Sequence, residues 1–229
     1  MSIAENLERV RAEIADACGR AGRRVEDVAL MAVSKVHPAE AIVEAHVAGQ
    51  RLFGENRVQE MQGKHAAVAG LAGIKLHLIG PLQNNKTAKA AELFDAVDTL
   101  DSLKTAERLN AAAQALGKVL PVLIEVKLSH EESKHGLAPA ELPALLEAMA
   151  ALSHVEARGL MTVPPWSEDA ETARPYFRAL RELRDAQAAR FPKLAELSMG
   201  MSGDFRVAIE EGSTVVRVGT AIFGKRVFA

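Results

Sequence analysis

The sequence is poor in cysteine and in aromatic residues, and it carries no excess of charge of either sign. Its one cysteine, Cys18, excludes an internal disulfide and any zinc site made of several thiolates. Its 28 basic and 30 acidic side chains give a formal net charge of -2. Binding to nucleic acid or to a membrane surface depends on clustered Lys and Arg, so we expect neither kind of partner.

Long apolar runs are also missing. None approaches the ~20 residues that a membrane-spanning helix needs, and residues 1–17 are charged and amphipathic where a signal peptide would be apolar. No low-complexity tract and no Pro- or Ser-rich linker marks a domain boundary. We therefore expect a cytoplasmic protein in which residues 1–229 form a single domain.

What the sequence does contain is an alternation of short apolar runs and helical patterns. Eight runs are predicted to be strands: Val28–Ser34, Arg51–Gly54, Lys75–Gly80, Ala96–Leu100, Leu120–Leu128, Val155–Val163, Glu196–Gly200 and Thr214–Ile222. The predicted helices between them include Pro38–Val47, Asn56–Val68, Leu103–Leu116, Pro139–Leu152 and Asp169–Arg190. Parallel strands joined by crossover helices follow from such alternation, and eight units predict an α/β protein with a (β/α)₈ TIM barrel. An open doubly wound sheet is the alternative.

An extra helix is predicted before the first strand. Ser2 and Glu5 have the spacing of a capping box that opens a helix running to about Ala21. The sequence ends at Ala229, soon after the last predicted strand. We therefore expect the first helix to cover the barrel where a final helix would otherwise lie.

Lys35 is the first polar residue of interest, because it ends an apolar run and the chemistry of such barrels lies at the carboxyl ends of the strands. It is either a solvated lysine at the rim, which is the ordinary situation for a lysine, or a nucleophile that forms a Schiff base. The second role requires surroundings that lower its pKa from ~10.4.

The loops after the seventh and eighth predicted strands have the composition of a phosphate site. Ser202 and Gly203 lead into a predicted short helix, Asp204–Glu211, and Gly219 and Thr220 follow the last strand pattern. Small residues and a helix N-terminus at these two loops commonly bind phosphate in this fold. A helix cap at Ser202 and a close-packed strand position at Gly219 are the structural alternatives.

Arg217 lies within an otherwise apolar run, so a buried guanidinium there needs a partner. A structural ion pair and a ligand atom are both open. Other motifs fail: Arg226 stands where a P-loop needs Ser or Thr, and His130–Lys134 lacks the second histidine of a zinc protease. No metal ligands and no Ser or Cys catalytic residues are therefore predicted.

Six ordered blocks resemble the pyridoxal phosphate homeostasis protein family. They are Met31–Lys35, Phe53–Glu60, His77–Lys86, Gly159–Met161, Ser198–Ser202 and Arg217–Gly224. The resemblance implies a barrel like the N-terminal domain of alanine racemase, with pyridoxal 5'-phosphate (PLP) held by Lys35 as a Schiff base. It also implies phosphate contacts from Ser202, Gly203, Gly219 and Thr220, with Asn56 and Arg217 near the cofactor.

Three positions depart from the family pattern. Asn84 stands where Ser is commoner, Gly203 varies with Asp, and His135 adds an imidazole to the Ser133–Gly136 segment. None affects Lys35. The sequence assigns no role to Glu55, Asn84 or Lys134.

The resemblance implies a carrier that buffers or delivers PLP inside the cell, with apo forms of PLP-dependent enzymes as expected partners. We expect a monomer without strong amino-acid turnover, because the only tyrosine, Tyr176, falls in a predicted outer helix and no second domain follows the barrel. A PLP-dependent racemase of low activity, a class I aldolase and a non-catalytic interaction module are the alternatives.

Overall fold

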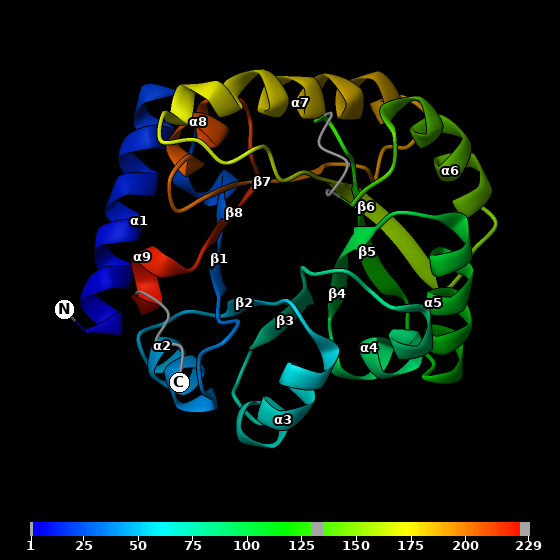
Figure 1. The fold of residues 1–229 in the computed structure, drawn as a ribbon, viewed down its shortest axis with the longest axis horizontal. Coiled ribbons are helices and arrows are strands. Elements are labelled where there is room, and N and C mark those ends of the chain that lie inside the picture. The colour runs from blue at the N-terminus through cyan, green and yellow to red at the C-terminus, as the bar shows by residue number, and fades with distance from the viewer. Residues whose placement is uncertain (1, 130–134, 225–229) are drawn as a thin grey trace.

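A closed barrel of eight parallel strands forms the centre of the computed structural model, which describes residues 2–129 and 135–224 (Figure 1). The strands are β1 (Ala29–Val33), β2 (Leu52–Glu55), β3 (Lys75–Leu78), β4 (Ala96–Leu100), β5 (Leu120–Glu125), β6 (Val155–Met161), β7 (Glu196–Met201) and β8 (Val215–Val218). They follow one another around the barrel in chain order, and β8 pairs with β1. The predicted TIM barrel is therefore confirmed and the open sheet is excluded.

Helices surround the strands in a ring (Figure 1). They are α1 (Ile3–Arg20), α2 (Ala39–Val47), α3 (Val58–Val68), α4 (Thr87–Leu93), α5 (Leu103–Ala115), α6 (Leu142–Met149), α7 (Arg174–Ala188), α8 (Phe205–Glu210) and α9 (Thr220–Phe223). Over the residues that the structure describes, short 3-10 segments also occur: η1 (Val25–Asp27), η2 (Asn84–Lys86), η3 (Pro139–Glu141) and η4 (Ala170–Ala173).

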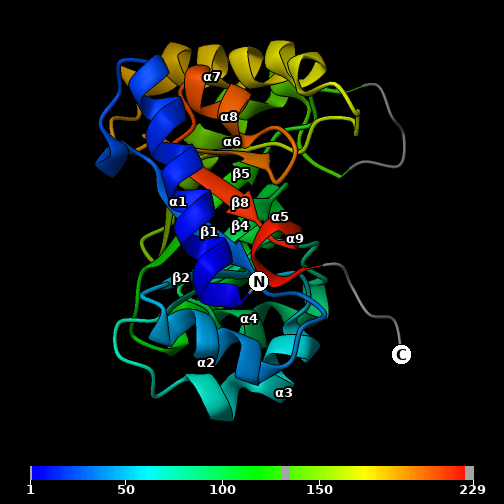
Figure 2. The ribbon, with the colours of Figure 1, turned by 90° about the vertical axis from the view of Figure 1, so that its left-hand side faces the viewer.

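The predicted first helix is present and has the predicted cap. The Ser2 hydroxyl accepts from the Glu5 N–H at 3.2 Å, and the Glu5 carboxylate accepts from the Ser2 N–H at 2.7 Å. This helix, α1, packs against α8, α9 and α2 (Figure 2). It fills the ring beside β8 and β1, as expected from the sequence.

Several predicted boundaries were wrong. The eighth strand ends at Val218, and the apolar residues after it form the short helix α9, because the backbone turns at Gly219. The Pro139–Leu152 and Asp169–Arg190 patterns each begin with a 3-10 turn, and the helix proper starts just before a proline. The sequence prediction did not include α4.

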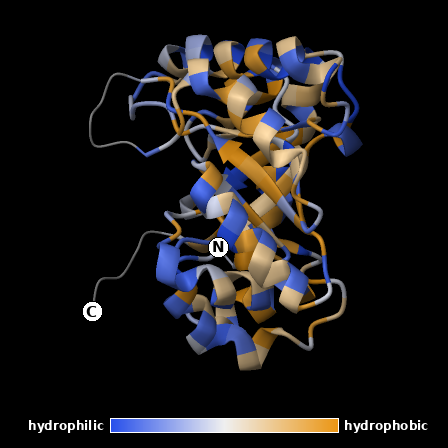
Figure 3. Cartoon of the chain, turned by 90° about the vertical axis from the view of Figure 1, so that its right-hand side faces the viewer, coloured by the Kyte–Doolittle hydropathy of each residue, from blue (hydrophilic) through white to orange (hydrophobic). Residues whose placement is uncertain are grey.

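The main apolar core lies between the strands and the helices. Its large fully buried side chains include Phe53, Phe94, Phe177 and Phe205. Figure 3 shows this distribution, with hydrophobic strands at the centre and hydrophilic positions on the outer helices. Inside the barrel the packing is more polar, because Asp98 and Arg217 are buried there. None of the described helices is long and apolar enough to cross a bilayer.

Candidate functional site

The predicted site residues gather at the carboxyl ends of four neighbouring strands. Ser202 and Gly203 follow β7, and Gly219 and Thr220 follow β8. Lys35 follows β1 and Asn56 follows β2. Because β7, β8, β1 and β2 are consecutive in the closed sheet, the structure brings together groups that the sequence separates by up to 185 positions.

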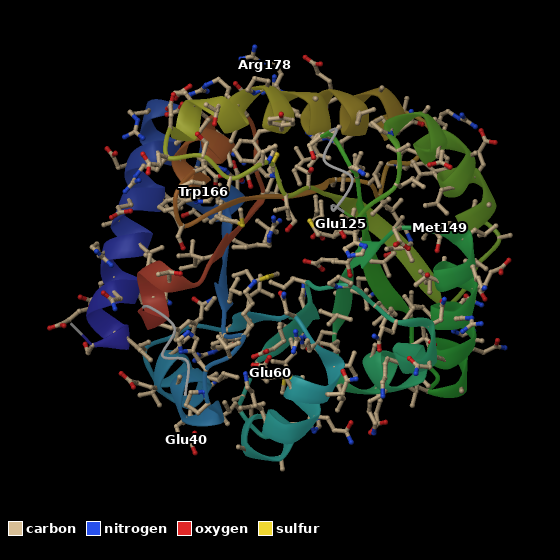
Figure 4. The ribbon with its side chains drawn as sticks, in the orientation of Figure 1. Glu40, Glu60, Glu125, Met149, Trp166 and Arg178 are labelled. Atoms are coloured by element: carbon tan, nitrogen blue, oxygen red, sulfur yellow. The ribbon has the colours of Figure 1, made fainter. Side chains whose placement is uncertain are left out.

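Lys35 lies in the turn between β1 and α2 and is partly buried. Its neighbours are fixed by a buried polar cluster. The Ser34 hydroxyl donates to Glu55 Oε1 at 2.7 Å, and Lys64 Nζ on α3 donates to the same oxygen at 2.9 Å. Lys64 Nζ also reaches Glu60 Oε1 at 2.6 Å. Figure 4 shows Glu60 on the side of α3 that faces the barrel.

Glu55, to which the sequence assigned no role, is fully buried in this cluster. Burial raises the pKa of its carboxyl group, although Lys64 and Ser34 act in the opposite direction. Its second oxygen, Oε2, has no hydrogen-bond partner among the described residues. Glu55 therefore presents an unused polar atom beside the Lys35 turn.

Lys64 was not predicted as a functional residue, although it lies within the predicted helix Asn56–Val68. A lysine in an amphipathic helix normally extends into solvent. The available signal was its position four residues after Glu60, which allows an ion pair. Burial of that pair depends on tertiary packing and has no counterpart in the local sequence.

The loops after β7 and β8 offer backbone donors. No acceptor within the described chain engages the N–H groups of Ser202, Gly203, Gly219 or Thr220. The side of Gly203 where a Cβ would lie is open, whereas a Cβ on Gly219 would lie 3.2 Å from the Val33 carbonyl oxygen. This arrangement suits an anion, because unengaged N–H groups lie in two adjacent loops.

Ser202 does not cap helix α8, although a cap was one of the two roles considered for it from the sequence. The N-cap residue is Asp204, and its Oδ1 accepts from the Met201 N–H at 2.5 Å. The Ser202 hydroxyl is therefore not used as a cap. Burial raises the pKa of the Asp204 carboxyl.

Arg217 projects inside the barrel and is only 4% exposed. It donates to Ser198 Oγ at 2.7 Å and to the Thr162 carbonyl oxygen at 2.9 Å. Both of these partners are neutral groups. Burial lowers the pKa of the guanidinium, while Asp98, Glu125 and Asp204 favour its charge through space. A guanidinium has five N–H donors, so donors remain beyond these two bonds.

Other residues singled out in the sequence lie elsewhere. Asn84 is exposed in η2, and its carbonyl accepts from Arg108 at 3.2 Å. Tyr176 is on the outer helix α7, as predicted. Two of the sequence motifs lie outside the described residues: the His130–Lys134 segment, which includes Lys134, and Arg226 of the P-loop-like pattern. Trp166 is 81% exposed in the loop after β6 (Figure 4).

The opposite end of the barrel has a charged cavity of about 560 Å³. Its lining includes His77, Asp98 and Glu196, with Lys118 and Arg158. His77 Nδ1 lies 3.0 Å from Asp98 Oδ1. None of the predicted site residues is in this cavity.

Comparison with known proteins identifies the family. The sequence model described as alanine racemase, N-terminal domain, matches residues 5–227. The pyridoxal phosphate homeostasis proteins of Vibrio cholerae and Escherichia coli are 45% and 47% identical to the chain, each over 98% of it and 97% of the relative. The chain belongs to the pyridoxal phosphate homeostasis protein family.

Solved structures agree with this family membership. PipY of Synechococcus elongatus matches with a TM-score of 0.88 without PLP and 0.87 with PLP bound, at 42% and 41% identity. Both matches cover 97% of this chain and 100% of PipY. An alanine racemase from Clostridium difficile matches with a TM-score of 0.75 at 15% identity, over 98% of this chain and 60% of that one. That last likeness shows a common fold.

Proposed function

We propose that the protein binds PLP at the carboxyl end of the barrel and serves in intracellular PLP homeostasis or delivery. The observation that carries this proposal is the convergence, on four neighbouring strands, of a lysine, a buried arginine and unengaged backbone N–H groups. PLP has an aldehyde that can react with the lysine, a pyridine ring nitrogen that can accept from the arginine, and a phosphate that can accept from the backbone N–H groups. The described residues therefore fit the cofactor.

In this proposal Lys35 is the point of attachment. Its neutral amine adds to the aldehyde carbon of PLP and the carbonyl oxygen leaves as water, so that a carbon–nitrogen double bond forms without oxidation or reduction. Ser202, Gly203, Gly219 and Thr220 hold the phosphate through their N–H and hydroxyl groups. Asn56 lies beside the ring.

Arg217 limits the chemistry of the proposed complex. Bound PLP supplies an electron sink for reactions at the α-carbon of amino acids. A guanidinium next to the ring nitrogen disfavours protonation of that nitrogen, because two cations repel each other, and so weakens the sink. The only tyrosine of the sequence, Tyr176, is on the outer helix α7 and cannot act as an acid or base opposite Lys35.

Borohydride reduction followed by peptide mass spectrometry tests the attachment site. We expect a pyridoxyl group on Lys35, and we expect Lys35→Ala to lose the visible absorbance band of the bound cofactor. Lys127→Ala is the matched control, since Lys127 also follows a barrel strand, β5, and this variant should keep the band. A pyridoxyl group found on Lys127, or none at all, would contradict the assignment.

The carrier and racemase roles differ in turnover. We expect the loaded protein to racemise alanine or serine at a negligible rate, as measured by polarimetry. Racemisation at ordinary enzymatic rates that disappears in Lys35→Ala would instead support the racemase. Delivery is tested by mixing the loaded protein with the apo form of a PLP-dependent enzyme, where transfer faster than release of free PLP is expected.

A further inference from the structure

We propose that Lys64 is a positioning residue that fixes the backbone on both sides of Lys35. The inference rests on the proposed function, because it gives Lys64 a purpose at the PLP lysine. Lys64 comes from α3, whereas Lys35 follows β1. The two lysines meet only through the fold.

The ammonium group of Lys64 is fully engaged and almost completely buried. Its side chain is 10% exposed. Nζ donates to the Ser34 carbonyl oxygen at 3.1 Å, to Glu55 Oε1 at 2.9 Å and to Glu60 Oε1 at 2.6 Å. An ammonium has three N–H donors, so all of them have acceptors. A lysine that only covered the surface would leave its charge in water.

These contacts hold the peptide units before and after Lys35. Lys64 binds the carbonyl of Ser34 directly, and Ser34 precedes Lys35 in the chain. The Glu60 oxygen that Lys64 orients also accepts from the N–H of Val36 at 2.5 Å. Lys64 and Glu60 therefore act as a clamp on the Lys35 turn, and we use that term for this pair.

Val36 shows that the turn needs to be held. Its φ is 62°, in the left-handed region that β-branched residues avoid. Its side chain is 56% exposed, so burial of its methyl groups does not compensate for the conformation. Two hydrogen bonds hold this conformation: the His37 N–H donates to the Ser34 carbonyl oxygen at 3.1 Å across the turn, and the Val36 N–H donates to Glu60 Oε1 at 2.5 Å.

The charges of the cluster explain why a cation is needed. Glu55 is fully buried, and Glu60 is close enough to share the same ammonium group. Without Lys64 the two carboxylates would face each other with no positive charge between them, which favours protonation of one or rotation of Glu60 away. Either change frees the Lys35 turn.

The first test compares Lys64→Met with Lys89→Met. Methionine keeps the length of the side chain but has no N–H donor, and Lys89 on α4 pairs with Glu92 at the protein surface. We expect the dissociation constant of PLP, measured by absorbance titration of the apoprotein, to rise at least tenfold for Lys64→Met and to stay unchanged for Lys89→Met. Equal affinities in the two variants would overturn the proposal.

A second test separates positioning from general stability. Glycine adopts a positive φ without strain, so Val36→Gly should make the turn less dependent on the clamp. We expect the double variant Lys64→Met/Val36→Gly to bind PLP several-fold more tightly than Lys64→Met. If Lys64 acted only on overall stability, Val36→Gly would weaken or leave unchanged the binding in that background, and the proposal would be wrong.

A third measurement does not use the cofactor. In the apoprotein, amide hydrogen exchange at Val36 should be slow in the native chain and in Lys89→Met, and at least tenfold faster in Lys64→Met. Unprotected Val36 in the native chain would refute the clamp. The exchange result and the borohydride result can also disagree. If Val36 is protected through Lys64 but borohydride places PLP on another lysine, the proposed attachment to Lys35 is wrong, and so is the role of Lys64 in positioning PLP. The contact of the clamp with the turn would still be confirmed.

Discussion

At the scale of single residues, the proposed phosphate contacts divide between backbone and side chain. Four backbone N–H groups are proposed to bind the phosphate, together with the hydroxyls of Ser202 and Thr220. Only these hydroxyls can be removed by substitution. Because most of the proposed donors belong to the main chain, no single side chain should be indispensable for holding the phosphate.

We therefore predict that Ser202→Ala weakens PLP binding without abolishing it. One hydrogen bond to a charged group contributes ~1.5–3 kcal/mol, so the dissociation constant should rise by about 10- to 150-fold. Titration of the apoprotein with PLP measures this change. If Ser202→Ala and Thr220→Val both bind PLP like the native chain, the phosphate must lie elsewhere.

The residue scale also shows what sequence can and cannot predict. Lys35 and Ser202 could be predicted as site residues because each follows an apolar strand pattern, and the barrel fold places such positions at one edge; Asn56 was implied by the family resemblance. Lys64 was not found, because its burial arises from the packing of α3 against the turn after β1. The end of β8 was missed because Ala221–Phe223 continue the apolar run as a helix.

At the scale of secondary-structure elements, α3 carries the clamp and contains a glycine. Gly63 lies within this helix, and a Cβ added there would meet no heavy atom within 4 Å. We predict that Gly63→Ala raises the free energy of unfolding by ~0.5–1 kcal/mol, because alanine has the higher helix propensity. Urea denaturation measures this effect.

Gly159→Ala is the contrasting variant. Its Cβ would lie 2.1 Å from the Glu196 carbonyl oxygen on the neighbouring strand β7, so β6 or β7 would have to move. This substitution should lower stability, and a stabilising effect would show that the close approach of the two strands is wrong.

The helix α7 is joined to the end of α8 by another ionic cluster. Glu211 is buried and accepts hydrogen bonds from Arg174, Arg178 and Arg181 at 2.9–3.2 Å. Burial alone would raise the pKa of its carboxyl, but the arginines reverse this, and the pKa lies below its ordinary value. The charged form is thus bound more strongly in the folded chain.

We predict that Glu211→Gln lowers the free energy of unfolding by about 1.5–3 kcal/mol at neutral pH. A lowered carboxyl pKa stabilises the folded state above the unfolded pKa of ~4.3, and this contribution is lost as pH falls through the folded value. The native chain should therefore lose more stability than Glu211→Gln on acidification. The control is Glu182→Gln, at an exposed position of the same helix α7, and it should behave like the native chain.

At the scale of the whole molecule, the two ends of the barrel have different chemistry. The carboxyl end collects the proposed PLP contacts, and the other end contains the charged cavity around His77 and Asp98. Burial opposes a charged imidazole, but Asp98 outweighs it, and the pKa of His77 lies above its ordinary value. This pair makes stability depend on pH near neutrality.

The raised pKa of His77 determines whether stability rises or falls with pH. A raised pKa means that His77 contributes fully below its unfolded pKa of ~6.5 and that the contribution is lost as pH rises through the folded value. We predict that the free energy of unfolding decreases over this interval and that His77→Gln removes this part of the pH dependence. Parallel pH profiles for the two proteins would mean that the pKa of His77 is the same in the folded and unfolded states, which would contradict the prediction.

The position of Trp166 gives the molecule an internal optical signal. It is the only tryptophan in the sequence, and it lies exposed in the loop after β6, at the same end of the barrel as Lys35. Its emission overlaps the absorbance of bound pyridoxal compounds, so energy transfer should dim its fluorescence when PLP occupies the barrel. Loading, release and hand-over to an acceptor enzyme could then be followed in real time with the unlabelled native chain.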